Sequence, residues 1–369
     1  MLLLLHDDII TLILNNLCCK DILNFSLINK KFKYLTRENA RNITQIIYNN
    51  IPNYLNAKSI KIMNEKNLLI ENFKNYENIT FENVIISNIN ILNNNNNIKY
   101  IKLFNTNLIS YFNPINYISL TSLILINNNS SIKIYNENNN VNINKFFNNL
   151  IKLSKLNTLY LENIFNNDIN ISDDICKLTS LTNLTSLGLC NIQKNICNEY
   201  NFLENMTKLK KLYLNNYYTD VKFKAPIFLN ELYIKYAFNK RPLLNYADYY
   251  LLHFNLMQPF LNIKLIDISN TNYLYTDLII TIIKNYYRTL EKLYVNNSNI
   301  GDLIIFNLSE YILKKIPSLS LDIYLKYNKF NNDSLIRLYN SSNININVSK
   351  HDMCVNNFNI KNYNRIIVK

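Results

Sequence analysis

The segment Leu120-Thr-Ser-Leu123-Ile-Leu125-Ile-Asn-Asn128 decides the fold of this 369-residue chain. It follows the spacing L-x-x-L-x-L-x-x-N, in which the fourth and sixth positions alternate with an outward-pointing residue, as on a β-strand with one buried face. The first position turns inward before the strand begins. A segment this short cannot bury its apolar face alone, so the motif predicts further copies of itself.

The same spacing recurs at intervals of roughly 19 to 36 residues and gives about eleven units. Clear copies begin at Leu156, Leu184, Leu209, Leu229, Ile263, Leu290 and Ser320, and weaker copies begin at Ala57, Tyr76 and Ile98. Stacked units bury their apolar faces against one another. These segments resemble leucine-rich repeats. The resemblance implies an α/β fold, a leucine-rich-repeat solenoid or horseshoe with a parallel sheet on its concave side.

Helices are expected between some of the strands, on the convex side. Residues Asp277–Leu290 carry apolar side chains at helical spacing, and Phe202–Leu212 shows the same pattern. The terminal asparagine of the motif is often replaced, although Asn328 stands at the expected place in its unit.

Residues Leu5 to Arg41 do not fit the repeat and predict three short amphipathic helices. The first helix follows Asp7 or Asp8, the second has Asp21 as its N-cap, and the third begins near Asn29. The simplest interpretation is a helical cap that closes the end of the solenoid.

The spacing within this segment also resembles the F-box family. The residues that carry the resemblance are Leu5-His6-Asp7-Asp8-Ile9, Ile13-Leu14, Leu17, Asp21-Ile22, Leu27-Ile28, Lys30, Phe32 and Leu35. His6 stands where the family has proline, Asn29 where it has cysteine, and Phe32 where it usually has tryptophan. The resemblance implies a small all-α, three-helix domain over residues 3–42 that docks on a Skp1-type adaptor. The residues implied for Skp1 binding are Leu5, His6, Ile9, Ile13, Leu14, Leu17, Ile22, Phe25, Ile28 and Phe32.

The F-box followed by repeats implies a substrate-recognition adaptor of a Skp1–cullin–F-box ubiquitin ligase. Residues 43–350 would form the solenoid that holds a protein substrate, and residues 351–369 a tail or cap. The alternative is a leucine-rich-repeat protein that binds a protein partner without any ligase link, its helices being only a cap. The abundance of Asn, Ile, Lys and Tyr reflects an AT-rich genome, such as that of a protist or a large DNA virus, and favours asparagine as a loop filler.

The composition argues against enzyme activity. Gly188 and Gly301 are the two glycines and lie far apart, so no glycine-rich phosphate-binding loop can be written. The histidines His6, His253 and His351 lie in no catalytic motif, and His253 is expected to be structural. We therefore assign no catalytic, cofactor-binding or metal-binding residues.

The formal charge of +13 is spread thinly along the chain. Dispersed lysines are typical of a solvated surface and disfavour nucleic-acid binding, which needs clustered charge. No stretch approaches 18 consecutive apolar residues, so no membrane span is predicted. The six cysteines form no C-x-x-C motif, which favours a reduced, cytoplasmic or nuclear protein.

Tyrosine is enriched at one position of the repeat, the outward residue between the fourth and sixth motif positions. The tyrosines at this position are Tyr160, Tyr213, Tyr233, Tyr294 and Tyr324. The flanking outward residues include Lys211, Glu231, Lys235, Asp267, Lys292, Asp322 and Lys326. Tyrosine combines a large contact area with few rotatable bonds, so the five tyrosines are predicted to form a partner-binding surface on the concave face. The alternative is that tyrosine is merely favoured in strands.

Overall fold

The computed structural model describes residues 44–47, 59–63, 76–86, 92, 96–108, 112–127, 140–164, 172–190, 199–215, 222–235, 258–271, 276–349 and 363–368. They divide between two compact units, Met1–Asn183 and Leu184–Lys369. The predicted helices of residues 3–42 and all three histidines lie outside the described residues.

The described part of the first unit is built on a parallel sheet with the strand order β1-β2-β3-β5-β7-β8. Its strands are β1 (Thr44–Ile47), β2 (Ser59–Met63), β3 (Asn78–Glu82), β5 (Tyr100–Phe104), β7 (Ser122–Ile126) and β8 (Thr158–Glu162). A second, two-stranded parallel sheet joins β4 (Ile85–Ile86) to β6 (Asn107–Leu108). The helical elements are η4 (Pro114–Asn116), α4 (Asn140–Leu150), α5 (Ser172–Cys176) and η5 (Lys177–Ser180).

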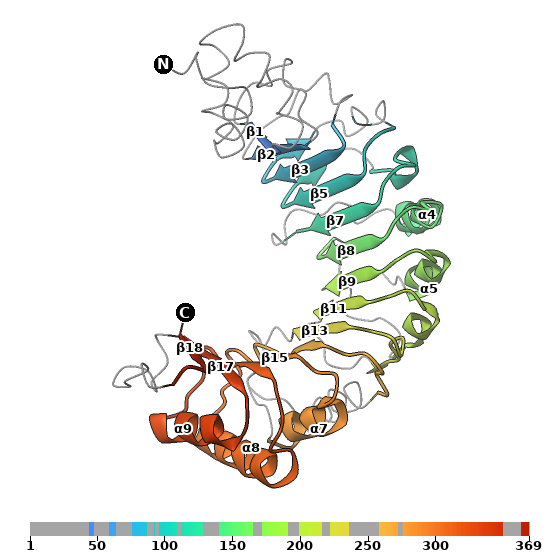
Figure 1. The fold of residues 1–369 in the computed structure, drawn as a ribbon. Helices are drawn as coiled ribbons and strands as arrows, with labels where there is room; N and C mark the ends of the chain where they lie inside the picture. Colours follow the sequence, from blue (N-terminus) through green and yellow to red (C-terminus); the bar gives the residue numbers. More distant parts are fainter. Residues whose placement is uncertain are drawn as a thin grey trace, which may run out of the picture. The chain divides into compact units, whose positions relative to one another are not determined.

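The described part of the second unit repeats this architecture. Its parallel sheet contains β9 (Ser186–Cys190), β11 (Lys211–Asn215), β13 (Glu231–Lys235), β14 (Leu265–Asp267), β15 (Lys292–Tyr294), β16 (Asp322–Tyr324), β17 (Asn345–Val348) and β18 (Ile366–Val368), in that order. Strands β10 (Glu199–Tyr200) and β12 (Lys222–Phe223) form a separate parallel pair. The helical elements are η6 (Asn201–Asn205), α7 (Thr276–Tyr286), α8 (Asp302–Lys315) and α9 (Asn332–Ser341). Within each unit the strands lie side by side in a sheet, and the helices lie on the side of the repeats that faces away from the sheet (Figure 1).

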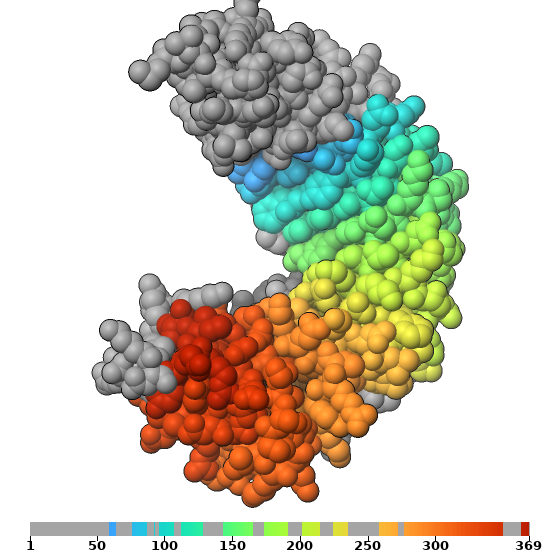
Figure 2. Space-filling model, viewed as in Figure 1, coloured from blue at the N-terminus to red at the C-terminus, as the bar shows by residue number. Residues whose placement is uncertain are grey.

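A strand occurs at every one of the predicted motif copies. In β7, Leu123 and Leu125 are fully buried, whereas the alternating residues Ser122, Ile124 and Ile126 are partly exposed. The same alternation holds in β2, β3, β5 and β8. Each buried leucine or isoleucine contributes roughly 1.5–3 kcal/mol. Because successive coils follow one another in sequence order within each unit (Figure 2), this gain comes from contacts between neighbouring repeats. The predicted α/β solenoid is confirmed.

Two predicted helices have different outcomes. Helix α7 buries Leu278, Ile279 and Ile282 as expected, and it ends at Tyr286. The helix predicted over Phe202–Leu212 is wrong: only the single 3₁₀ turn η6 forms there. The apolar residues Leu209 and Leu212 of the predicted helix belong to the next repeat motif. Because that motif forms strand β11, the chain becomes extended there and the helix cannot continue.

Asparagines provide the left-handed backbone that other proteins leave to glycine. Six of the seven described non-glycine residues with positive φ are asparagines, namely Asn83, Asn105, Asn163, Asn270, Asn297 and Asn299. Asparagine tolerates this region better than other residues with a Cβ atom. Four of the six are also linked in pairs across neighbouring coils: Asn105 donates to Asn83 at 3.2 Å, and Asn297 donates to Asn270 at 3.0 Å.

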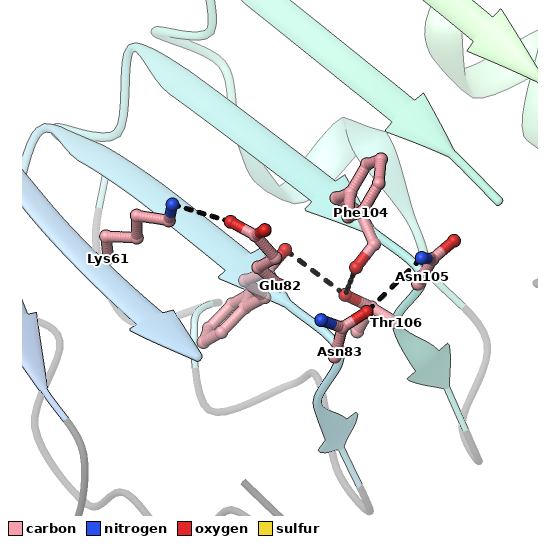
Figure 3. Close-up of polar contacts among 7 residues, drawn as sticks. Lys61, Glu82, Asn83, Phe104, Asn105 and Thr106 are labelled. Carbon is pink, nitrogen blue, oxygen red and sulfur yellow. Dashed lines mark hydrogen bonds and ion pairs between the residues drawn. The ribbon is translucent and has the colours of Figure 1, made fainter. Parts of the chain in front are cut away.

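Polar side chains at the ninth motif position satisfy buried backbone groups. In the first unit the Thr106 hydroxyl donates to the carbonyl oxygens of Phe81 and Phe104, at 3.3 and 3.2 Å (Figure 3). In the second unit Thr271, Ser298 and Asn328 occupy this position in successive coils, and all three are buried. The Thr271 hydroxyl donates to Ser298 Oγ at 3.1 Å, and the Ser298 amide donates to Asn328 Oδ1 at 3.0 Å. We call these three residues the polar spine.

Candidate functional site: the tyrosine row

The outward face of the second unit carries most of the predicted tyrosines in a single row. Parallel pairing without slippage aligns the middle residue of each strand with that of the next. The aligned residues are Gly188, Tyr213, Tyr233, Asp267, Tyr294, Tyr324 and Asn347. We call the segment from Tyr213 to Tyr324 the tyrosine row.

The four tyrosines of this row form two stacked pairs. The rings of Tyr213 and Tyr233 lie 4.2 Å apart between centroids with an interplanar angle of 10°. Those of Tyr294 and Tyr324 lie 3.9 Å apart at 12°. Each such pair adds about 0.5–1.5 kcal/mol of stability beyond the stabilisation that comes from burying apolar area. Stacking holds the rings in place before any partner arrives, so binding loses little side-chain freedom.

Charged groups fix the orientation of the first pair. The Tyr233 hydroxyl donates to Glu231 Oε2 at 2.9 Å, and Lys211 Nζ lies 2.9 Å from Glu231 Oε1. Burial raises the pKa of Tyr233 above its ordinary value, and the hydrogen bond to the Glu231 carboxylate raises it further. The phenol therefore stays neutral and acts as a hydrogen-bond donor.

The second pair lies close to two carboxylates. The pKa of Tyr294 is raised to about 12, first by burial, then by the hydrogen bond with Tyr324, and also by the negative charges of Asp267 and Asp322. The Asp322 Oδ1 atom accepts a hydrogen bond from Asn345 Nδ2 at 2.7 Å. This end of the row thus combines aromatic surface with negative charge.

Asp267 interrupts the row between the two pairs. It pairs in register with Tyr233 on one side and Tyr294 on the other. Its Oδ1 atom accepts a hydrogen bond from the Ser269 amide at 3.0 Å, which fixes the carboxylate. Asp267 was predicted to flank the tyrosine position. The register places it in the row itself, because it stands between the inward residues Ile266 and Ile268 of its motif.

Tyr160, the fifth predicted tyrosine, belongs to the first unit. It aligns with Ile124 of β7, and its hydroxyl donates to Glu162 Oε2 at 3.1 Å. It therefore shares the tyrosine–carboxylate arrangement of Tyr233, but it stands in the other unit. The outward face of the first unit also carries the Lys61–Glu82 ion pair at 2.6 Å (Figure 3).

The described ranges offer neither a metal-binding cluster nor a membrane-spanning helix. They contain no group of three or more His, Cys, Asp or Glu side chains placed to hold a metal ion. In the same part of the chain, the helices are too short or too polar to cross a bilayer. Of the cysteines described, Cys176 is exposed and Cys190 is buried, and neither forms a disulfide.

Comparison with known proteins identifies the N-terminal segment. Residues 2–44 match the family model of the F-box domain. The chain carries an F-box domain ahead of its repeats. All ten residues predicted to bind Skp1 fall within the matched segment and lie outside the described residues, so their roles stay predictions.

Solved structures are similar to most of the chain at low identity. An internalin (InlF) of Listeria monocytogenes is 15% identical, with 85% of this chain and 79% of that chain covered and a TM-score of 0.39. The plant peptide hormone receptor RGFR1, solved in complex with RGF2, is 12% identical, with 78% of this chain and 54% of that chain covered and a TM-score of 0.32. No curated protein matches the sequence. The repeat fold is established by the recurring motif and by the parallel sheets it forms.

Proposed function

We propose that this protein is a substrate-recognition adaptor of a Skp1–cullin–F-box ubiquitin ligase. The observation that carries the proposal is the F-box domain at residues 2–44 together with a repeat sheet that presents the preordered tyrosine row. The F-box would bind a Skp1-type adaptor, and the row would bind a protein substrate. We propose a cytoplasmic or nuclear location, where such ligases act.

The adaptor would do no bond chemistry of its own. It would hold a substrate near the ubiquitin-charged enzyme of the ligase, which raises the effective concentration of a substrate lysine there. A rigid sheet suits this task, because tyrosines that leave successive strands in one direction form a single patch without any loop ordering.

Skp1 retention tests the ligase link. The full-length protein, co-expressed with Skp1, should retain it through affinity purification and gel filtration. The double substitution of Ile13 and Leu14 to aspartate should abolish retention. The matched control replaces two lysines on helices of the second unit, Lys284→Glu and Lys315→Glu, and should retain Skp1 fully. If the intact protein fails to hold Skp1 where a known F-box protein succeeds, it is a repeat protein without a ligase link.

Alanine substitution tests the tyrosine row. Replacing Tyr213, Tyr233 and Tyr294 together should weaken substrate capture by well over tenfold, because each central aromatic contributes about 2 kcal/mol when it is a hot spot. Skp1 retention should not change. Capture is measured by quantitative mass spectrometry of proteins that the wild type enriches from cell lysate. If the Lys284→Glu and Lys315→Glu control loses those proteins and the tyrosine variant keeps them, the recognition surface lies elsewhere.

A further inference from the structure

The break in the tyrosine row leaves a slot between the two ring pairs. Tyr233 and Tyr294 are two strands apart with Asp267 between them. The rings within each pair are separated by 4.2 and 3.9 Å, which is less than the strand spacing of about 4.8 Å, so the two rings of each pair lean toward each other. Two strand spacings put the facing rings of Tyr233 and Tyr294 about 10 Å apart. A planar group that stacks on one ring lies about 3.5–4 Å from it, so the gap admits such a group against either ring.

The floor of this slot carries a negative charge that no described cation neutralises. Asp267 accepts one hydrogen bond, from the Ser269 amide, and makes no ion pair among the described residues. Among the described lysines nearest in register, Lys211 pairs with Glu231 at 2.9 Å. Lys292 aligns with Leu265 on one side and with Asp322 on the other, and it makes no ion pair with Asp267. The remaining lone pairs of Asp267 are therefore available to a donor that enters from the outward face.

We propose that this slot binds the guanidinium group of an arginine on the protein substrate. The guanidinium is planar, stacks on aromatic rings and donates two parallel hydrogen bonds to a carboxylate. Two ring walls and a carboxylate floor match all three properties. This inference rests on the proposed use of the row as a protein-binding surface and names the side chain that the row would recognise.

The slot also distinguishes arginine from lysine. Leu265 lies on the same strand and the same face as Asp267, and it is partly exposed. It offers an apolar contact to the methylene stem of an entering side chain. An ammonium group cannot stack as a plane against the rings and is more strongly hydrated than a guanidinium.

Small cations test the slot on the intact protein. The probes are N-ethylguanidinium and n-butylammonium, titrated against the full chain with ¹³C-labelled tyrosine rings and followed by NMR. Ethylguanidinium should shift the ring signals of Tyr233 and Tyr294 and leave those of Tyr160 unchanged. Butylammonium should bind about tenfold more weakly.

Two matched variants assign the effect to the carboxylate. Asp267→Asn keeps the shape and the acceptor for the Ser269 amide, and it should weaken ethylguanidinium binding by about tenfold. Asp333→Asn removes the same charge from an exposed site on α9 and should change nothing. The inference is overturned if ethylguanidinium causes no shift, if both cations bind alike, or if Asp267→Asn binds as the wild type does.

Peptide selection separates this inference from the proposed function. Random twelve-residue peptides displayed on phage are selected on the wild type and on Asp267→Asn. Arginine should be enriched on the wild type and not on the variant. Peptides that need the tyrosines but show no arginine enrichment would support the row and overturn the slot. Loss of Skp1 binding with arginine enrichment intact would overturn the ligase link and leave the slot standing.

Discussion

Asn328 should be among the most costly single positions in the second unit. Its side chain is 4% exposed and makes four hydrogen bonds, all to backbone groups. The Oδ1 atom accepts from the amides of Ser298 and Ile300, both at 3.0 Å. The Nδ2 group donates to the carbonyl oxygens of Val295 and Leu325, at 2.8 and 2.9 Å.

Asn328→Ala would leave these four backbone groups buried without their partner. At about 1 kcal/mol for each bond, the loss in free energy of unfolding is about 3–5 kcal/mol. Asn328→Asp keeps both accepted bonds but turns a carboxylate oxygen toward two carbonyl oxygens, so it should destabilise at least as much. Asn340→Ala, at an exposed position of α9, is the control and should change stability by less than about 0.5 kcal/mol.

Two measurements check this. Urea unfolding followed by circular dichroism gives the loss of stability, and hydrogen exchange reports the amides of Ser298 and Ile300 directly. Both amides should exchange faster in Asn328→Ala than in the control. A loss below about 1 kcal/mol, with exchange of both amides unchanged, would refute the reasoning.

Two further predictions concern single side chains. Thr106→Val removes the buried hydroxyl that donates to two carbonyl oxygens, and it should lower the free energy of unfolding in urea by about 1 kcal/mol. The control Thr121→Val removes a more exposed hydroxyl and should lower it by less than about 0.5 kcal/mol. Equal losses in the two variants would contradict this prediction. The pKa of Tyr294, raised to about 12 from an ordinary value of 10.0, should fall in Asp267→Asn when the ring carbons are titrated by NMR. Because the pKa of Tyr294 is higher in the folded protein than in the unfolded chain, the neutral phenol stabilises the fold fully below about pH 10. This contribution is lost between about pH 10 and 12. An unchanged pKa of Tyr294 in Asp267→Asn would contradict the influence of the Asp267 charge.

The strands were predictable because the motif states which side chains point inward. Two apolar residues separated by one outward residue suffice to specify a buried strand face, so each copy from Ala57 to Ser320 marks a strand. Strand β17 was not predicted, although Ile344, Ile346 and Val348 alternate as buried residues. Its unit has Asn343 at the first motif position, where most copies have leucine or isoleucine, so the spacing alone did not single it out.

The tyrosines were predictable as a class, but their arrangement was not. The motif position alone identifies Tyr213, Tyr233, Tyr294 and Tyr324 as outward residues. That they stack in two pairs around Asp267 depends on the register between strands, and a single unit's sequence does not contain that register. The helical spacing of Phe202–Leu212 gave a wrong prediction for a related reason. Two of its leucines, Leu209 and Leu212, belong to the motif of strand β11.

If the gene is as AT-rich as the composition predicts, asparagine at the left-handed turns ties the architecture to base composition. Glycine, the usual residue at such turns, needs codons that begin with two guanines, and these are scarce in an AT-rich genome. Asparagine codons begin with two adenines. At Asn83, Asn105 and Asn270 the side chain accepts the turn's geometry, and it also bonds the neighbouring coil, which glycine could not do. Mutational drift toward adenine and thymine would therefore erode a glycine-based repeat array and leave this one intact.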